Sequence, residues 1–249
     1  MKLTMANVSI NYEVKGEGDP IVLIHHLAGS IESWEKLIVP LSSKHRVIAY
    51  DLRGHGNSSV PASPYLISDH TSDLISLLEY LSVKDPVIIG HSIGSLIAID
   101  FSLKRSVKKV VLIGALYKAP DKFSYMRYVD VAVRFGMEGL AYHRRIRGEL
   151  PSKITDDFEN WNRFVRLYRK TSVKGYVNSV YGLLAAPNYE EELSKIEEVV
   201  LIYGSNDGLR LNKDVFTRST KVKYHEIQGA GHFLNLEESE KLLELLNQL

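Results

Sequence analysis

Residues 86–95 read P-V-I-I-G-H-S-I-G-S, and this stretch constrains the fold more than any other part of the chain. An apolar β-branched run gives way to G-H-S-I-G at 90–94, and the apolar helix formers of 96–103 follow at once. The pattern predicts a buried strand, a tight turn with Ser92 at its apex, and a helix. Side chains two positions before and after the serine would collide in such a turn, and the two glycines remove both collisions. The pattern is short, and taken alone it also fits a glycine-rich turn in which the serine has no function.

The rest of the chain alternates between apolar runs typical of buried strands and amphipathic segments typical of helices. Strands are expected at 21–24, 47–50, 87–89, 110–113, 199–203 and 222–227, and helices at 34–41, 69–81, 96–103 and 237–249. Residues 2–14 alternate apolar and polar side chains around a short turn, which predicts an antiparallel hairpin. Apolar strands separated by helices indicate an α/β fold with a mostly parallel, doubly wound sheet covered on both faces.

Residues 116–193 break this alternation. The segment has no apolar strand runs and places its aromatic residues at helical spacing. We therefore expect a helical lid, inserted over the carboxyl edge of the sheet. It belongs to the same domain as the α/β core, which is expected to comprise residues 1–115 and 194–249.

The expected lid is also basic. In residues 122–174 there are twelve Lys and Arg against six Asp and Glu, an excess of +6. Two groups of arginines contribute to this excess: Arg144, Arg145 and Arg147 in one run, and Arg163, Arg166 and Arg169 at helical spacing. The simpler interpretation is a solvated face of the lid, and the alternative is an electrostatic preference for acidic substrates.

Length and composition suit one large globular domain, with 249 residues, 45% hydrophobic and 24% charged side chains. Cysteine is absent, which excludes disulfides, thiolate metal sites and a cysteine nucleophile. No apolar run approaches the roughly 18 residues of a membrane span, and the first residues lack the apolar core of a signal peptide. We expect a cytoplasmic protein with no membrane span. The net charge of +1 gives no case for nucleic acid as a partner.

Three polar residues lie in the loops that follow expected strands: Ser92, Asp207 and His232. Ligands of open α/β sheets bind at the carboxyl ends of the strands, so these side chains are placed where chemistry is expected. Serine needs a base to take its proton, and histidine titrates in the right range. A carboxylate on the other ring nitrogen fixes the imidazole tautomer and stabilises the imidazolium. The three residues therefore predict nucleophilic catalysis.

Each assignment has an alternative. Asp207 lies in Asn-Asp-Gly and could serve only to form a turn, while Asp121, after the preceding strand, is the rival carboxylate. His232 could be a surface histidine at the end of a strand. His225 and His143 suit a general base less well, because they lie within an expected strand and in a basic run.

Five segments, in order, resemble signatures of the α/β-hydrolase superfamily. They are H-H-L-A-G-S at 25–30, D-L-R-G-H-G-N-S at 51–58, G-H-S-I-G at 90–94, Y-G-S-N-D at 203–207 and G-A-G-H-F at 229–233. The chain resembles lidded serine esterases and lactonases of this superfamily over essentially its whole length, the insertion excepted. The chain order Ser…Asp…His is also that of the superfamily. The resemblance implies a triad of Ser92, Asp207 and His232 that needs neither a metal nor an organic cofactor, and a structural role for Arg53 and His55.

An oxyanion hole needs two backbone donors aimed at the developing negative charge. The expected donors are the N–H of Ile93, directly after the nucleophile, and the N–H of Leu27, in the loop after the first central strand. This loop departs from the superfamily, which has His-Gly where this chain has His25-His26. His26 is therefore either a solvated loop histidine or a side chain that reaches the substrate pocket.

These residues together predict hydrolysis of a small-molecule ester or lactone by acyl transfer to water. Ser92 attacks the carbonyl, His232 moves the proton, Asp207 orients His232, and Leu27 and Ile93 hold the oxyanion. Two other classes of function stay open. One is a non-hydrolytic enzyme on the same scaffold, such as a lyase, a perhydrolase or a cofactor-free dioxygenase. The other is a ligand receptor that keeps the triad.

Overall fold

The apolar runs form the centre of an eight-stranded sheet in the computed structural model, which describes residues 1–248. Its strands are β1 (Lys2–Thr4), β2 (Ser9–Lys15), β3 (Pro20–Ile24), β4 (Arg46–Tyr50), β5 (Val87–His91), β6 (Lys109–Ile113), β7 (Glu198–Gly204) and β8 (Lys221–Ile227). They are arranged in the order β1-β2-β4-β3-β5-β6-β7-β8. Strands β1 and β2 pair antiparallel, as do β2 and β4, and all other pairs are parallel. The predicted hairpin and mostly parallel sheet are confirmed.

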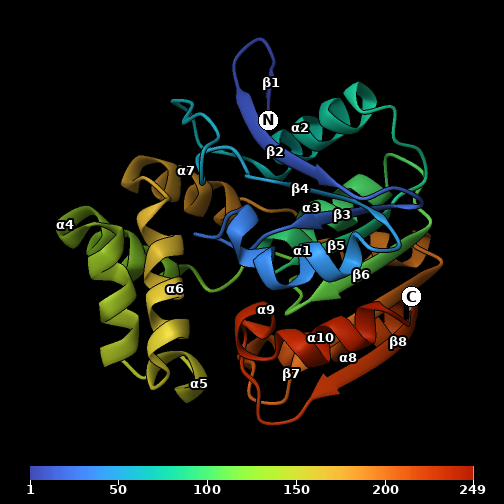
Figure 1. The fold of residues 1–249 in the computed structure, drawn as a ribbon. Coiled ribbons are helices and arrows are strands. Elements are labelled where there is room, and N and C mark those ends of the chain that lie inside the picture. Colours follow the sequence, from blue (N-terminus) through green and yellow to red (C-terminus); the bar gives the residue numbers. More distant parts are fainter. Residues whose placement is uncertain (249) are drawn as a thin grey trace.

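Helices cover both faces of the sheet, because alternate residues of each central strand point to opposite sides. On one side Val22 and Ile88 pack with α2 (Ile67–Tyr80) and α3 (Ile93–Ser102). On the other side Leu23 and Ile89 pack with α1 (Glu35–Leu41) and α10 (Ser239–Leu246). Figure 1 shows this layered arrangement, with α1 and α10 in front of the sheet.

The remaining short helices of the core are η1 (Ile31–Trp34), η2 (Glu192–Lys195), η3 (Gly208–Asn212), α8 (Lys213–Ser219) and α9 (Leu234–Glu237). Two predicted boundaries are wrong. Helix α3 begins at Ile93, directly after the turn, and the single helix expected at 237–249 is two helices, α9 and α10, separated at Glu238. The expected end of that helix at Leu249 lies outside the described residues. None of the helices in residues 1–248 is long and apolar enough to cross a bilayer.

Residues 116–193 hold four α-helices: α4 (Lys122–Ile146), α5 (Ser152–Thr155), α6 (Phe158–Arg169) and α7 (Val173–Leu184). Helix α4 is kinked at Gly136, which has φ 72° and ψ 177°. The four helices form their own apolar cluster, which also takes in Ala28, Phe233 and Leu236 from the core. Figure 1 shows α4, α5 and α6 at one end of the molecule. Apolar packing therefore joins the inserted helices to the loops after β3 and β8.

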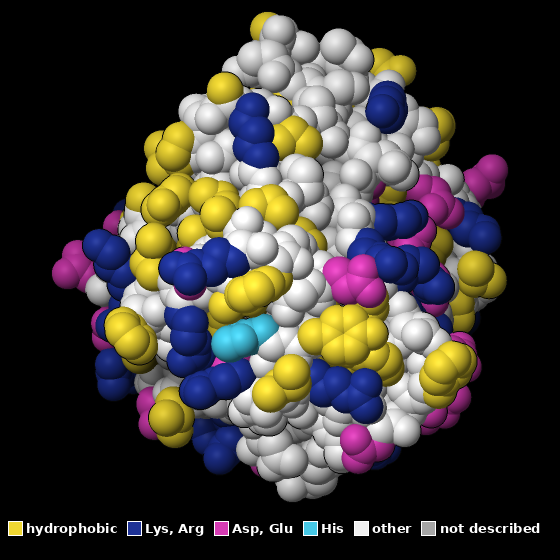
Figure 2. Space-filling view, turned by 90° about the vertical axis from the view of Figure 1, so that its left-hand side faces the viewer, with side chains coloured by type: hydrophobic (Ala, Val, Ile, Leu, Met, Phe, Trp, Pro, Cys, Tyr) yellow, Lys and Arg dark blue, Asp and Glu magenta, His cyan; other side chains and the backbone are white. Residues whose placement is uncertain are grey.

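Ion pairs reinforce this docking. Arg163 of α6 is 2.7 Å from the Glu35 carboxylate of α1, and its side chain is only 2% exposed. Arg166 and Lys170 both pair with Glu32 of η1. The expectation of a solvated arginine face is therefore wrong for Arg163, whereas Arg166 and Arg169 are exposed. Figure 2, which views the end of the molecule formed by the inserted helices, shows lysine and arginine side chains interspersed with hydrophobic ones.

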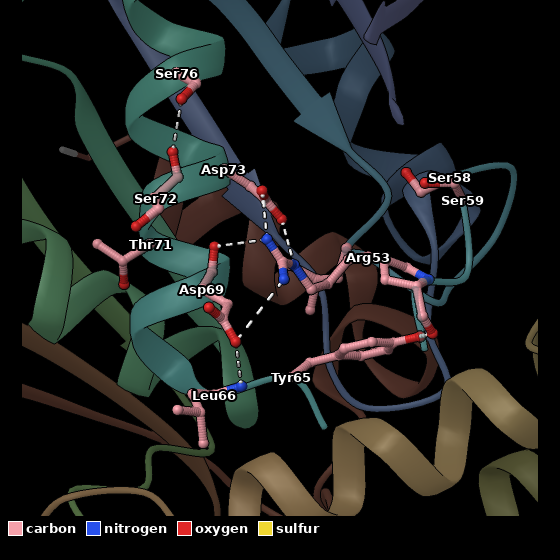
Figure 3. A network of polar contacts seen from close by, with 12 residues as sticks. Arg53, Ser58, Ser59, Tyr65, Leu66, Asp69, Thr71, Ser72, Asp73 and Ser76 are labelled. Atoms are coloured by element: carbon pink, nitrogen blue, oxygen red, sulfur yellow. Dashed lines mark hydrogen bonds and ion pairs between the residues drawn. The ribbon is translucent and has the colours of Figure 1, made fainter. Parts of the chain in front are cut away.

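The segment 51–58 is held by a buried polar network (Figure 3). Arg53 donates from Nε and Nη2 to the two carboxylate oxygens of Asp73 in α2, each over 2.7 Å. Its Nη1 lies 3.8 Å from the Asp69 carboxylate, and the guanidinium lies over the Tyr65 ring at 5.9 Å. This bidentate pair fastens the loop after β4 to α2, as the resemblance implied for Arg53.

Five histidines, namely His25, His26, His55, His70 and His91, are buried in or beside these loops. Burial lowers the pKa of all five, to about 3 for His26 and to about 4 for His55. In the unfolded chain the pKa of each histidine is about 6.5. Between the folded and the unfolded pKa, each of these histidines binds a proton in the unfolded chain but not in the folded one. The free energy of unfolding therefore decreases as the pH falls through this range.

We predict that lowering the pH from about 7 to about 5 decreases the free energy of unfolding by about 2 kcal/mol for each histidine that stays neutral in the fold. Urea unfolding at several pH values measures this fall. In His55→Asn the amide keeps a donor for the Arg53 carbonyl oxygen, and the fall should be smaller by about 2 kcal/mol. Parallel pH profiles for the variant and the wild type would contradict the prediction.

Candidate active site

Ser92 lies at the junction of β5 and α3 in a strained conformation, with φ 58° and ψ −116°. A Cβ on Gly90 would stand 2.2 Å from the carbonyl oxygen of Gly94, and a Cβ on Gly94 would stand 2.4 Å from that of Ile24. No side chain fits at either position, so the two glycines allow β3, β5 and α3 to meet at this point. The turn therefore has the geometry expected from the sequence, with Ser92 at the N-terminus of α3.

His232 and Asp207 meet beside this turn. The Nδ1 of His232 is 2.9 Å from Oδ2 of Asp207, and the Asp207 side chain is only 3% exposed. Burial raises the pKa of the Asp207 carboxyl, but the His232 ring and the Leu209 N–H stabilise its charge and hold the pKa below the usual value. A charged Asp207 favours a hydrogen on Nδ1 of His232, and in the neutral ring the other nitrogen is then an acceptor. This is the arrangement that a general base requires.

Two residues that the sequence analysis did not assign position the His232 loop. The carboxylate of Glu237 in α9 accepts hydrogen bonds from the N–H groups of Gly231 and Phe233, at 2.7 and 2.8 Å. The Nε2 of His91 donates to the carbonyl oxygen of His232 over 2.8 Å. The backbone is therefore held on both sides of His232. The available signal for Glu237 was a carboxylate five residues after the histidine, at the start of an apolar helix.

The rival residues lie elsewhere. Asp121 is exposed, and its carboxylate accepts the Ser124 N–H, which caps α4. His225 lies within β8, and His143 lies in α4. Among the described residues the hydrogen-bond partner of His232 Nδ1 is Asp207.

A cavity of about 440 Å³, here named the Ser92 cavity, brings the candidate residues together. The core contributes His26, Leu27, Ser92, Asp207, Leu209, His232 and Phe233, and the inserted helices and their connections contribute Tyr125, Tyr128, Arg144, Glu149, Tyr168 and Tyr176, with Asp121 and Ser124 at the start of α4. The cavity thus lies between the carboxyl edge of the sheet and the insertion. Residues 1–248 contain no group of three or more His, Asp or Glu placed to hold a metal ion.

The two expected backbone donors are free. Within residues 1–248 neither the Leu27 nor the Ile93 amide has a hydrogen-bond acceptor. Leu27 lines the Ser92 cavity, and Ile93 directly follows Ser92 at the first turn of α3, where N–H groups have no partner in the helix. Free amides beside a nucleophile can stabilise an oxyanion.

His26 is only 1% exposed, so the interpretation as a solvated loop histidine is wrong. Its Nδ1 is 2.9 Å from the Leu27 carbonyl oxygen, and its ring packs against those of His91 and Phe233 at 5.0 and 5.1 Å. The left-handed residue of this loop is Ala28, with φ 60°, so the side chain of His26 costs no backbone strain. The loop closes without the usual glycine, and His26 becomes part of the cavity wall.

Arg144 also differs from expectation. Arg145 and Arg147 are exposed, as a solvated face requires, but the Arg144 side chain is only 17% exposed and lines the Ser92 cavity. Its guanidinium lies over the rings of Tyr128 and Phe233, each at 5.4 Å. The interpretation as a solvated face is therefore wrong for this residue.

A family model described as "alpha/beta hydrolase fold" matches residues 19–239. The 3-oxoadipate enol-lactonase 2 of Acinetobacter baylyi is 27% identical over 245 residues, which cover 95% of this chain and 91% of the relative. A putative non-heme chloroperoxidase of Synechocystis is 43% identical over 91 residues, which cover 36% of this chain and 33% of the relative.

A solved structure from a study of carboxylesterases of the thaumarchaeon Nitrososphaera gargenis superposes with a TM-score of 0.86. It is 28% identical and covers 100% of this chain and 97% of its own. The agreement extends over the sheet, the covering helices and the insertion, because the whole chain is aligned.

Proposed function

Because the chain belongs to the α/β-hydrolase fold family, we propose that it hydrolyses small carboxylic esters or lactones, with Ser92 as the nucleophile. The observation that carries the proposal is the Ser92 cavity. One wall presents a serine on a strained turn, and another presents His232 with its Nδ1 bonded to Asp207. One relative is named an enol-lactonase, and one similar solved structure comes from a study of carboxylesterases. Both names support an ester bond as the bond that is cleaved.

In the proposed first step Ser92 Oγ attacks the carbonyl carbon while the Nε2 of His232 takes its proton. Negative charge develops on the carbonyl oxygen, and the free N–H groups of Leu27 and Ile93 donate hydrogen bonds to it. His232 then gives its proton to the departing alkoxide, and Asp207 stabilises the imidazolium in between. An acyl group remains on Ser92.

In the second step a water molecule attacks the acyl group, with His232 again as the base, and releases the carboxylic acid. We also propose that helices α4–α7 act as a lid. Their tyrosines close the Ser92 cavity on the side opposite the sheet, and a covered site strengthens the electrostatic contacts of the oxyanion. The contacts with Ala28 and Phe233 couple the lid to both loops that carry candidate residues.

Perhydrolysis is the second candidate, favoured by the relative named a putative non-heme chloroperoxidase. Hydrogen peroxide would replace water in the second step, giving a peroxyacid and free Ser92. The two candidates share the acyl-enzyme and differ in the molecule that attacks it, so added peroxide distinguishes them. A steady yield of acid without peroxide supports hydrolysis.

We expect the purified protein to turn over para-nitrophenyl acetate or a simple lactone, and Ser92→Ala to lower kcat by at least about a thousandfold. Ser102→Ala, at the far end of α3, is the control and should retain wild-type activity. Product release in stopped-flow and steady-state assays measures both. Retention of most of the activity by Ser92→Ala would show that another group is the nucleophile, and one stoichiometric burst without turnover would indicate a receptor.

The assignment of the carboxylate makes a second prediction. Asp207→Asn should lower kcat by about a thousandfold or more, because the amide no longer holds the base tautomer of His232. Asp121→Asn is the matched control, since Asp121 also borders the Ser92 cavity but caps α4. Its kcat should change by less than about threefold, because asparagine keeps an oxygen that can accept the Ser124 N–H and cap α4. The reverse result would make Asp121 the acid of the triad.

A further inference from the structure

We propose that Arg144 binds a carboxylate of the substrate, so that the preferred substrate is a small ester or lactone that carries one negative charge. The inference rests on the proposed function and deepens it by naming the substrate class. It starts from an arginine that the fold turns away from solvent, into the same cavity as Ser92 and His232.

The guanidinium of Arg144 is fixed in place. It lies between the rings of Tyr128 and Phe233, 5.4 Å from the centre of each, and its Nη1 donates to the Tyr168 hydroxyl over 2.6 Å. Phe233 directly follows His232 in the chain. The cation is therefore held near the candidate base by aromatic stacking, which leaves the edge of the guanidinium available for a planar anion.

Arg144 shares its carboxylate partner with two other arginines. Its nearest carboxylate is Glu149, whose Oε2 is 3.6 Å from Nε. Glu149 is already engaged by Arg127 at 2.8 Å, by the Tyr128 hydroxyl at 2.7 Å and by Arg147 at 3.7 Å. Three arginines thus share one carboxylate, which leaves a local excess of positive charge.

The Nε of Arg144 is buried and has no hydrogen-bond partner among the described residues. The other carboxylates of the cavity do not supply one, because Asp207 is bonded to His232 and Asp121 caps α4 at the rim. Leaving a donor of a buried charged group unpaired is costly, so the site is suited to an anion from outside the protein.

Neutral donors surround the same space. Tyr125 and Tyr176 line the Ser92 cavity, and neither hydroxyl has a hydrogen-bond partner within residues 1–248. Burial raises the pKa of Tyr125 to about 12 and that of Tyr176 well above its usual value, so both keep their protons at neutral pH. Two O–H donors and one cation match the acceptors of a carboxylate. A cavity of about 440 Å³ holds only a small molecule beside them.

Two pairs of esters test the inference, each pair matched in size and differing in charge. The first is mono-para-nitrophenyl glutarate against its methyl ester, with the charge on the acyl side. The second is para-acetoxybenzoate against its methyl ester, with the charge on the alcohol side. We expect the wild type to favour the charged member of at least one pair in kcat/KM. Arg144→Gln should lower kcat/KM for that member by about tenfold to a hundredfold, mainly through KM. The uncharged member should change by less than about threefold.

The controls separate charge from structure. Arg145→Gln, the exposed neighbour, should leave both members unchanged, and Arg144→Lys should recover part of the loss. An equal loss for both members of each pair in Arg144→Gln, or a wild type that favours the uncharged members, would overturn the inference while leaving hydrolysis intact. Absence of turnover for all four esters would instead contradict the proposed function. If Arg144→Gln does not fold, the wild-type preference and competitive inhibition by glutarate decide the matter.

Discussion

The close approach of β3, β5 and α3 at Gly90 and Gly94 is the constraint on which the rest of the structure depends. These backbones approach so closely that a Cβ on either glycine would overlap a carbonyl oxygen. The approach accompanies the strained conformation of Ser92, which lies at the N-terminus of α3, a helix buried from Ile93 to Phe101. It also sets the loop with Leu27 beside the first turn of α3, so that Leu27 and Ser92 line one cavity and Ile93 directly follows the serine.

The sheet and the three candidate catalytic residues could be predicted from the sequence because their signals are local. Apolar runs with β-branched residues mark strands wherever both faces are covered, and the loops that follow parallel strands meet at one edge. Ser92, Asp207 and His232 each lie within five residues of the end of such a run. Boundaries were less accurate: α3 begins three residues earlier than its apolar pattern indicated, and the break at Glu238 has no proline or glycine to mark it.

What the sequence could not show depends on contacts between distant segments. Arg144 and Arg145 are adjacent and chemically identical, and only the packing of α4 on Phe233 decides which one enters the cavity. His26 looked like a solvated loop residue, yet the rings of His91 and Phe233 pack against it and it is only 1% exposed. Glu237 holds its role because α9 turns back towards the His232 loop, and no local pattern encodes that turn.

The central claim is that His232, held by Asp207, activates Ser92. Intact-mass analysis after treatment with a fluorophosphonate, followed by peptide mapping, tests it most directly, because this reagent reports an activated serine without a substrate. The account predicts one rapid adduct, located on Ser92 and absent from Ser92→Ala. A folded protein that forms no adduct, or forms it on another residue, would contradict the account.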